Sequence, residues 1–422
     1  MITDRRLGPL GGATRRRVTV GAPADAGPVL AECRRVLGAG WREGLRAGVP
    51  YGYTAPSRGR YPWQWYWDSC LTAVALRRLD SGRARRELDS LVSARRADGF
   101  IGHTIFWAEP LRGVRRLFYN VTGARDGMTA TIQPPLLAWA WRVAVGNPGE
   151  EPGIRAHHDH VRADRDLDGD GLLWILQPDE SGLDASPAFD PVWGERIGGA
   201  PGFPLLVRRN RRFGFDLRRV AAHGGPVVCE VLTNVAHALS TLALERPSIT
   251  PRLVDRLYDE RTGLFRDDVR PALSPGTRRP VTWTALAPLA LPDLPEAIGR
   301  RLVEEHLLDR KRFWAPVAPP SVALDDPAFT TDDRRLGLRR YWRGPTWVNA
   351  AWLVWLGLVR LGYADEAAAM AAGVGAAVAA AGLREYYDPW TGGGMGARDF
   401  AWSSLVLELI DPDPRAASSY LD

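Results

Sequence analysis

The sequence predicts an all-α fold, in which helices form inner and outer rings of a toroid, from three observations. About a dozen segments carry apolar residues at three- and four-residue spacing, the period of an amphipathic helix. Alternating β-branched runs are short and few; Pro204–Val207 and Pro226–Cys229 are the best candidates, so a small hairpin is expected but no large sheet. Short and long connections alternate along the chain, which suits helices packed in two rings.

The elements are expected in the following order. Residues 1–27 are rich in Gly, Pro and Arg and are predicted to be a flexible N-terminal arm. No break in composition divides the rest, so residues 28–422 are expected to form a single domain. Helices are predicted at about 28–47, 68–80, 83–97, 129–145, 153–163, 228–245, 251–259, 283–290, 295–308, 345–361, 363–381 and 399–410.

The long connections are heavy in Pro, Gly and Trp. Loops of more than about 15 residues are uncommon in compact domains and are often functional. In a toroid they would gather at one end around a cup, and residues 164–227 are expected to form a cap over it. The other long loops are 49–67, 98–128, 309–344 and 382–398.

Composition places the 422-residue chain among globular proteins, with 45% hydrophobic and 25% charged residues. The 17 tryptophans are unusual, because such large flat side chains fill a core or line a concave site. The three cysteines, Cys33, Cys70 and Cys229, lie far apart and show neither a disulfide nor a zinc pattern. A reducing cytoplasm is therefore the expected compartment.

Charge and hydropathy argue against two classes of partner. The net charge is +6, but the arginines are scattered between acidic residues without a nucleic-acid-binding motif, so no nucleic-acid partner is expected. The N-terminus lacks the apolar core of a secretory signal. The stretch Ala350–Leu361 is about a dozen residues long, short of the ~20 that cross a bilayer, so no membrane partner is expected.

The first segment with chemical potential, Tyr61–Ser69, has the sequence YPWQWYWDS. Asp68 there can cap the following helix. Aromatic rings beside a carboxylate also suit a sugar, because the rings cover its C–H faces and the carboxylate accepts bonds from its hydroxyls. Sugar binding is the favoured interpretation, with Trp65, Trp67 and Asp68 as candidate residues.

The segment Asp166–Trp174 (DLDGDGLLW) resembles the start of a calcium-binding EF-hand loop through Asp166, Asp168 and Asp170. The twelfth position of such a loop is Gln177 instead of the usual Glu. A tight turn capped by Asp side chains is therefore favoured over a metal site.

The next segment, Gln177–Asp190 (QPDESGLDASPAFD), holds four carboxylates among small residues and prolines: Asp179, Glu180, Asp184 and Asp190. Turns shape this backbone, so the acids do not form a solvated helix face. Each of them could nevertheless be structural.

Two segments near the C-terminus complete the set. In Tyr341–Asn349 (YWRGPTWVN), Pro345 suits the first turn of a helix and Arg343 lies beside aromatic residues. In Arg384–Gly396 (REYYDPWTGGGMG), Glu385 precedes a run of glycines that lets backbone approach a ligand closely. Taken alone, Glu385 could equally lie at a helix end.

Taken together, the motifs QWYWDS, DGDGL, ESGLDASPAFD, YWRGPTW and EYYDPWTGGG, with TIQPPLLAWA at 131–140, resemble glycoside hydrolase family 63 and its mannosylglycerate and glucosylglycerate hydrolase branch. The resemblance spans about residues 60–405. It implies an (α/α)6 barrel and an inverting mechanism. The family's general acid matches Asp184 and its general base matches Glu385.

The resemblance also implies a set of substrate-binding residues. Trp67 and Asp68 match the family's sugar-binding pair, and Gln133, Tyr341, Trp342 and Arg343 fall in its ligand-lining motifs. Trp65 and Gly344 belong to the same motifs, and Glu180 is the reserve acid because it lies one helical turn from Asp184.

The assignment is chemically coherent. Inversion needs one protonated carboxyl and one ionised carboxylate roughly 6.5–9.5 Å apart on opposite sides of the sugar bond. Burial against apolar surface would keep Asp184 protonated, and a wetter position beside glycines would keep Glu385 ionised. Two hundred residues separate the two acids, so only the closed fold can bring them together.

The expected substrate is a small α-glucoside or α-mannoside, with glucosylglycerate and mannosylglycerate among the candidates, and no cofactor or metal is expected. The arginines of residues 206–219 could hold a glycerate carboxylate, or could be a solvated basic loop. The alternatives are a trehalase-like or α-glucan oligosaccharide glucosidase, a noncatalytic sugar-binding toroid, and a lyase or isomerase.

Overall fold

A computed structural model of the chain describes residues 26–107, 111–112, 119–122, 127–194, 202–332, 334–335 and 338–411. Of the predicted N-terminal arm, residues 1–27, residues 1–25 lie outside these ranges.

Helices dominate the described residues, as predicted. The α-helices are α1 (Gly27–Gly40), α2 (Tyr66–Leu76), α3 (Ser81–Ala94), α5 (Leu137–Ala144), α6 (Pro152–Arg165), α7 (Asp190–Trp193), α8 (Gly202–Arg212), α9 (Leu217–Ala222), α10 (Val231–Ala243), α11 (Thr250–Leu257), α12 (Glu296–Arg301), α13 (Val348–Leu361), α14 (Ala364–Ala381) and α15 (Val406–Ile410). Shorter or non-α turns are η1 (Pro148–Glu150), η2 (Pro178–Ser181), η3 (Pro187–Phe189), η5 (Trp283–Ala290), η6 (Leu302–Leu307) and η7 (Ala401–Leu405).

The strands are short and form antiparallel pairs only. These pairs are β1 (Trp41–Arg46) with β2 (Val49–Thr54), β3 (Gln64–Trp65) with β4 (Thr104–Ile105), β5 (Val227–Cys229) with β8 (Asp268–Arg270), β6 (Tyr258–Asp259) with β7 (Leu264–Phe265), β9 (Arg334–Arg335) with β10 (Leu338–Arg339), and β11 (Arg384–Tyr387) with β12 (Gly394–Arg398).

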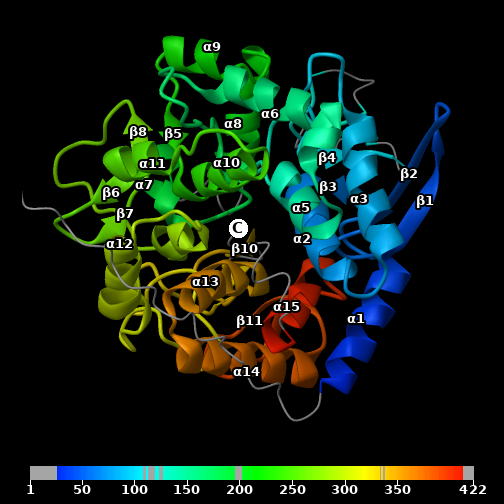
Figure 1. Ribbon diagram of the computed structural model, residues 1–422. Helices are drawn as coiled ribbons and strands as arrows, with labels where there is room; N and C mark the ends of the chain where they lie inside the picture. The colour runs from blue at the N-terminus through cyan, green and yellow to red at the C-terminus, as the bar shows by residue number, and fades with distance from the viewer. Residues whose placement is uncertain are drawn as a thin grey trace, which may run out of the picture.

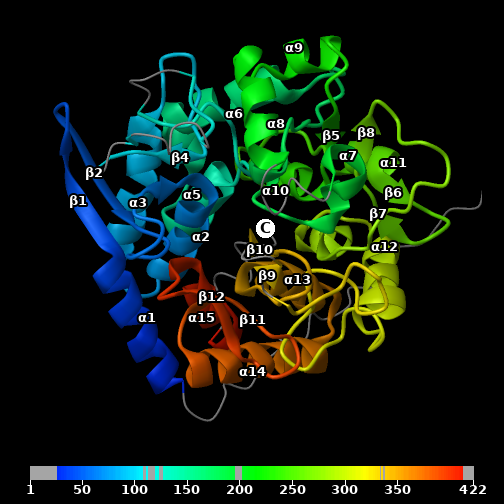
Figure 2. The ribbon, with the colours of Figure 1, turned by 180° about the vertical axis from the view of Figure 1, so that it is seen from behind.

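The helices are arranged in two layers around a common centre (Figures 1 and 2). Within the described residues, the inner elements α2, α5, α10, η5, α13 and η7 form a closed circuit, in which each packs against the next and η7 packs against α2. Elements α1, α3, α6, α11, α12 with η6, and α14 pack against the outside of this circuit.

The sequence of each element explains its layer. Inner helix α13 is apolar around most of its circumference and is buried from Val348 to Leu358, as expected for a helix with neighbours on every side. Outer helix α3 buries one stripe, which includes Ala84, Leu88 and Leu91, and exposes the charged opposite face. Helical periodicity therefore separates the two layers.

Helix α14 is the one helix among the described residues that is long and apolar enough to cross a membrane by length and composition. It has 18 residues and a mean hydropathy of 1.2, and 39% of it is buried. A helix was predicted here at about 363–381, but the membrane-length argument had been applied only to Ala350–Leu361. In the fold, α14 packs against α13 and α15 at the periphery of the molecule (Figure 1).

Three local predictions were wrong. The helix predicted at 28–47 ends at Gly40, and a β-hairpin follows whose turn residues Ala47 and Gly48 both have positive φ. The helix predicted from 129 begins only at Leu137, because Pro134 and Pro135 precede it.

The third error concerns Pro204–Val207, which was a strand candidate but lies inside α8. A short apolar run does not distinguish a strand from one face of a helix. Here Leu206, Val207 and Asn210 form the buried face of α8. The other candidate was correct, because Val227–Cys229 is β5 and pairs with β8.

Candidate active site

An open pocket of about 510 Å³ lies at the end of the molecule where inner elements α2, α13 and η7 begin. Its lining combines aromatic rings with four carboxyl groups. The lining residues are Pro56, Tyr61, Trp65, Trp67, Asp68, Gln133, Asp179, Gly182, Asp184, Tyr341, Trp342, Trp347, Glu385, Phe400 and Trp402.

Asp184 reaches the pocket from the loop between η2 and η3. The preceding Gly182 has φ 72°, and a Cβ at that position would lie 2.5 Å from the Trp67 ring, so only glycine allows this close approach. Ala185, which follows Asp184, also has a positive φ of 64°. A bent backbone of this kind is uncommon for a residue with a Cβ and is typical of functional loops.

The environment of Asp184 favours its protonated form. The pocket leaves the side chain open to solvent, but protein surrounds it on its other sides. This burial, and secondly the negative charge of Glu385, raise the pKa of Asp184 to about 6. Asp184 thus holds a proton at a higher pH than an ordinary aspartate does.

Glu385 lies on β11, two hundred positions after Asp184 in the sequence, and lines the same pocket. Its Oε2 accepts a hydrogen bond of 2.7 Å from the backbone N–H of Ala397 on β12, and its Oε1 accepts one of 3.1 Å from the Tyr61 hydroxyl. The Tyr61 hydroxyl also contacts the hydroxyl of Tyr341. Donors aimed at a carboxylate favour its ionised form.

Aromatic rings and a third acid form the remaining wall. Trp67 packs edge-on against Trp402 with ring centroids 5.2 Å apart, and Trp342 stacks on Trp347 at 3.8 Å. Asp68 lies in the first turn of α2, and burial, followed by the charge of Glu385, raises its pKa well above the ordinary value. Flat rings next to a carboxyl suit the apolar faces and hydroxyls of a sugar.

Gln133 lies before α5 and is oriented by the backbone. Its Oε1 accepts a hydrogen bond of 3.1 Å from the N–H of Trp67. This contact leaves the amide Nε2 as the group that can donate to a ligand.

The structure brings most of the predicted site residues together in this pocket. Asp184 and Glu385, two hundred positions apart in the sequence, share it with six predicted binding residues: Trp65, Trp67, Asp68, Gln133, Tyr341 and Trp342.

Three predicted residues do not line the pocket. Glu180 is fully buried, pairs with Arg165 at 2.7 Å and accepts the backbone N–H groups of Ile132 and Leu176. The Arg343 guanidinium binds both carboxylate oxygens of Asp190. These side chains hold loops around the pocket in place.

Gly344, the third of these residues, has a backbone role. A Cβ on it would lie 2.1 Å from the carbonyl oxygen of Thr330, and its N–H donates to the hydroxyl of Ser321 at 2.8 Å. Only glycine fits between these two segments.

Five polar or aromatic lining residues were absent from the predicted site: Tyr61, Asp179, Trp347, Phe400 and Trp402. Three of them lie in motifs that had been singled out, so the signal was present. Phe400 and Trp402 lie after the last motif, near η7, so no motif pointed to them. Asp179 is held by Gln177 and Asn120, and burial, followed by the charge of Asp184, raises its pKa to about 7.

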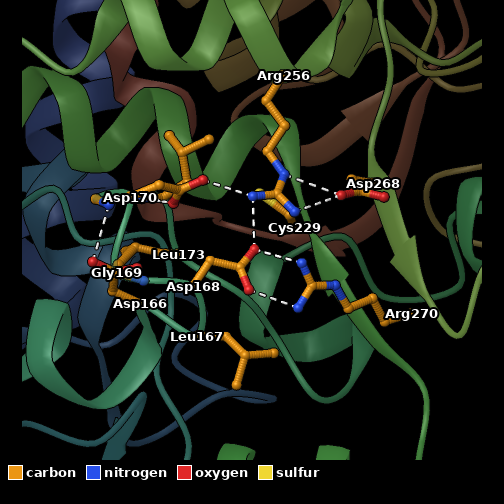
Figure 3. Close-up of polar contacts among 12 residues, drawn as sticks. Asp166, Leu167, Asp168, Gly169, Asp170, Leu173, Cys229, Arg256, Asp268 and Arg270 are labelled. Atoms are coloured by element: carbon orange, nitrogen blue, oxygen red, sulfur yellow. Dashed lines mark hydrogen bonds and ion pairs between the residues drawn. The ribbon is translucent and has the colours of Figure 1, made fainter.

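The aspartate-rich segment forms a turn, as favoured (Figure 3). The Asp166 carboxylate accepts the backbone N–H groups of Gly169 at 2.7 Å and Gly171 at 2.9 Å. Arg256 contacts Asp168 at 2.7 Å and Asp170 at 2.6 Å. The Arg256 guanidinium thus occupies the space between these carboxylates where a metal ion would bind. Among the described residues, no group of three or more His, Cys, Asp or Glu side chains is placed to hold a metal ion.

The arginines of residues 206–219 are not brought to the pocket lining. Arg211 donates to the carbonyl oxygens of Tyr119 and Val121, and Arg218 donates to that of Asp166 at 2.6 Å. These contacts fix neighbouring loops.

Comparison with known proteins gives consistent results. The family model described as a mannosylglycerate hydrolase MGH1-like glycoside hydrolase domain matches residues 61–403. Mannosylglycerate hydrolase of Rubrobacter radiotolerans is 27% identical, over 91% of this chain and 98% of its own length. Glucosylglycerate hydrolase of Mycolicibacterium hassiacum is 25% identical, over 82% of this chain and 91% of its own.

A solved structure is also similar over most of its length. It is the family 63 mannosylglycerate hydrolase of Thermus thermophilus in complex with Tris and D-glycerate, which is 25% identical to this chain and has a TM-score of 0.71. The match covers 90% of this chain and 98% of that one.

Proposed function

Because the chain belongs to the family of mannosylglycerate hydrolase MGH1-like glycoside hydrolases, we propose that this glycosidase cleaves the α-glycosidic bond of a small glucoside or mannoside with inversion of configuration. The observation that carries the proposal is one pocket lined by aromatic rings and by both Asp184 and Glu385. We propose that residues 28–422 form one (α/α)6 barrel, which the closed circuit of inner elements supports.

In the proposed mechanism, Asp184 is the general acid. Its raised pKa supports this role, because the group that protonates the departing oxygen must hold a proton before the bond breaks. Glu385 is the general base that removes a proton from the attacking water. Its hydrogen bonds from Ala397 and Tyr61 support an ionised and fixed carboxylate.

Trp67, Asp68 and the neighbouring tryptophans would hold the sugar ring. Gln133 supports recognition of the second half of the substrate, because its free amide Nε2 can donate to an oxygen of that group. Glucosylglycerate and mannosylglycerate are the proposed substrates, since relatives named for these compounds match most of this chain. The buried, free thiols Cys33, Cys70 and Cys229 support a reducing compartment such as the cytoplasm.

The test is to incubate the purified chain with α-glucosylglycerate, α-mannosylglycerate, trehalose and kojibiose, and to follow the released sugar by NMR. We expect one of the two glycerate glycosides to be cleaved fastest, with the β-anomer of the sugar released first. Release of the α-anomer would refute inversion. Preferential cleavage of trehalose or kojibiose would identify the trehalase-like or glucan-directed alternative, and no cleavage of any glycoside would favour a noncatalytic protein.

A further inference from the structure

A second hollow, lined by a separate set of residues, lies near the start of η5. It has a volume of about 390 Å³ and lies between β7 and the segment that leads into η5. Thr282 and Thr284 at the start of η5 line it, and so does Ala188, which follows Asp184 by four positions. Because the main pocket lies where other inner elements begin, the hollow is at the same end of the molecule.

Two half-buried arginines line this hollow, Arg266 and Arg279. The Nε of Arg266 is buried and has no hydrogen-bond partner among the described residues, although it forms an ion pair with Asp259 at 3.5 Å. Arg279 donates to the main-chain oxygen of Asp267. Burial, and then the charge of Arg279, lower the pKa of Arg266, so the two cations repel each other.

Hydroxyl groups add further donors. The hydroxyl oxygens of Thr282 and Thr284 lie 2.8 Å apart, so one donates to the other and the second can donate to a ligand. Paired guanidinium groups with a nearby hydroxyl are the donors that bind carboxylate and phosphate oxygens most strongly in proteins.

One acid, Asp267, shares the hollow. Its Oδ1 accepts the backbone N–H of Val231 at 2.9 Å, which directs part of the carboxylate toward the start of α10. Burial raises the pKa of Asp267 and also that of neighbouring Glu230. The lining itself thus holds two guanidinium groups and one carboxyl, and Asp259 pairs with Arg266 from outside the lining.

From this arrangement we propose that the hollow is a second binding site, which takes a small anion with a carboxylate or phosphate group. It has a direct connection to the main pocket. Trp283, between the two threonines, stacks on Trp342 with ring centroids 5.9 Å apart, and Trp342 lines the main pocket.

The test is isothermal titration calorimetry of the full chain with inorganic phosphate and, separately, with sodium acetate. We expect saturable binding of at least one of the two, weakened about tenfold or more by Arg279→Gln and by Arg266→Gln. The matched control is Arg252→Gln, which removes one charge from the exposed face of α11 and should not change the dissociation constant.

A third variant, Asp184→Asn, assigns the binding to one of the two pockets. Binding that Asp184→Asn preserves and Arg279→Gln weakens belongs to the hollow. An equal dissociation constant in the wild type and in Arg279→Gln would overturn the proposal, as would no heat of binding for either anion at about 10 mM. If Arg279→Gln does not fold, Thr284→Val tests the same site. Calorimetry needs no substrate, so its outcome is independent of the proposed hydrolysis.

Discussion

Asp184 and Glu385 carry the same chemical group into one pocket, and their surroundings differ. Among the described residues no group donates a hydrogen bond to the Asp184 carboxylate, and its pKa is raised by desolvation and by Glu385. Glu385 instead receives a backbone N–H and a tyrosine hydroxyl. Hydrogen bonds to one carboxyl and desolvation of the other are the means by which a protein separates an acid from a base.

Replacement of either carboxyl by its amide tests this division of roles. Asp184→Asn and Glu385→Gln should each lower kcat by about 10²–10⁴, because an amide cannot transfer the proton, while leaving the melting temperature nearly unchanged. The control is Asp365→Asn, an exposed acid in the first turn of α14. Near wild-type turnover in both pocket variants would exclude the proposed acid and base.

The pH profile gives a second test of Asp184. In the proposed mechanism its protonated form is the active one, and its pKa is raised to about 6, so kcat/KM should fall as the pH rises through about 6. Steady-state rates between pH 4.5 and 8.5, the interval that brackets this value, would reveal that alkaline limb. A profile that stays flat up to pH 8.5 would show that a group with a higher pKa supplies the proton.

At the level of elements, hairpin β11–β12 fixes the position of Glu385. Gly396 on β12 has φ 67°, and a Cβ there would lie 2.7 Å from the Glu385 Oε2. Gly396→Ala should therefore displace the carboxylate and lower kcat by about 10². Gly276→Ala is the matched control, because Gly276 has φ 80° but open space around it. An equal effect of both variants would attribute the loss to backbone strain alone.

Helix α3 carries a buried carboxyl that does not line the pocket. Glu87 accepts hydrogen bonds from the hydroxyl of Ser69 at 2.6 Å and from the backbone of Thr54 at 2.7 Å, so it joins α2 to β2 beside Asp68. Burial raises its pKa to about 8 in spite of these donors. Glu87 is therefore protonated in the folded protein at neutral pH.

This raised pKa makes a stability prediction. The unfolded chain releases the proton near pH 4.5, so the contribution of Glu87 to folding is complete below that pH and is lost as the pH rises to about 8. Glu87→Gln mimics the neutral acid. Its free energy of unfolding should therefore rise relative to that of the wild type by about 1.4 kcal/mol for each pH unit between pH 4.5 and about 8. Urea unfolding at pH 5 and pH 8 measures the difference. A constant difference between the two proteins would refute it.

The periodicity of apolar residues predicted most of these elements, and the failures have local causes. Helices α13 and α14 were recognisable because each repeats its apolar stripe over several turns. The run Pro204–Val207 is too short for its period to be read, and α8 depends on Asn210 reaching the Leu176 carbonyl and Gln177. Such contacts across the fold leave no trace in the local sequence.

On the scale of the whole molecule, the ring closes where C-terminal elements meet α2. Arg77, directly after α2, pairs with buried Glu408 of α15 at 2.8 Å, and Arg78 pairs with exposed Asp411 at 2.7 Å. Glu408→Ala should cost about 3–5 kcal/mol, because the largely buried Arg77 guanidinium loses a buried acidic partner. Asp411→Ala, the control from the same junction, should cost less than about 1 kcal/mol. Denaturant titration distinguishes the two, and equal costs would refute a structural role for the buried pair.

The site shows the same limit of sequence reasoning. Motifs identified Trp67, Asp184 and Glu385 as candidates, but only the closed circuit brings them to one pocket. Glu180 is the opposite case: it also lies in a motif, but its side chain is buried in an ion pair with Arg165 and does not line the pocket. Whether a side chain faces a cavity or the core depends on neighbours far away in the chain, and one sequence does not record them.

Closure by the last elements has a consequence during synthesis. A growing chain that has left the ribosome only as far as α14 already carries Asp184, but it lacks Glu385 and Trp402 and has nothing to pack against the open flank of α2. Its exposed apolar surface would then be a target for chaperones. Such a protein gains its catalytic competence only after the elements that follow α14 have been made, and a premature stop before them would release a chain without activity.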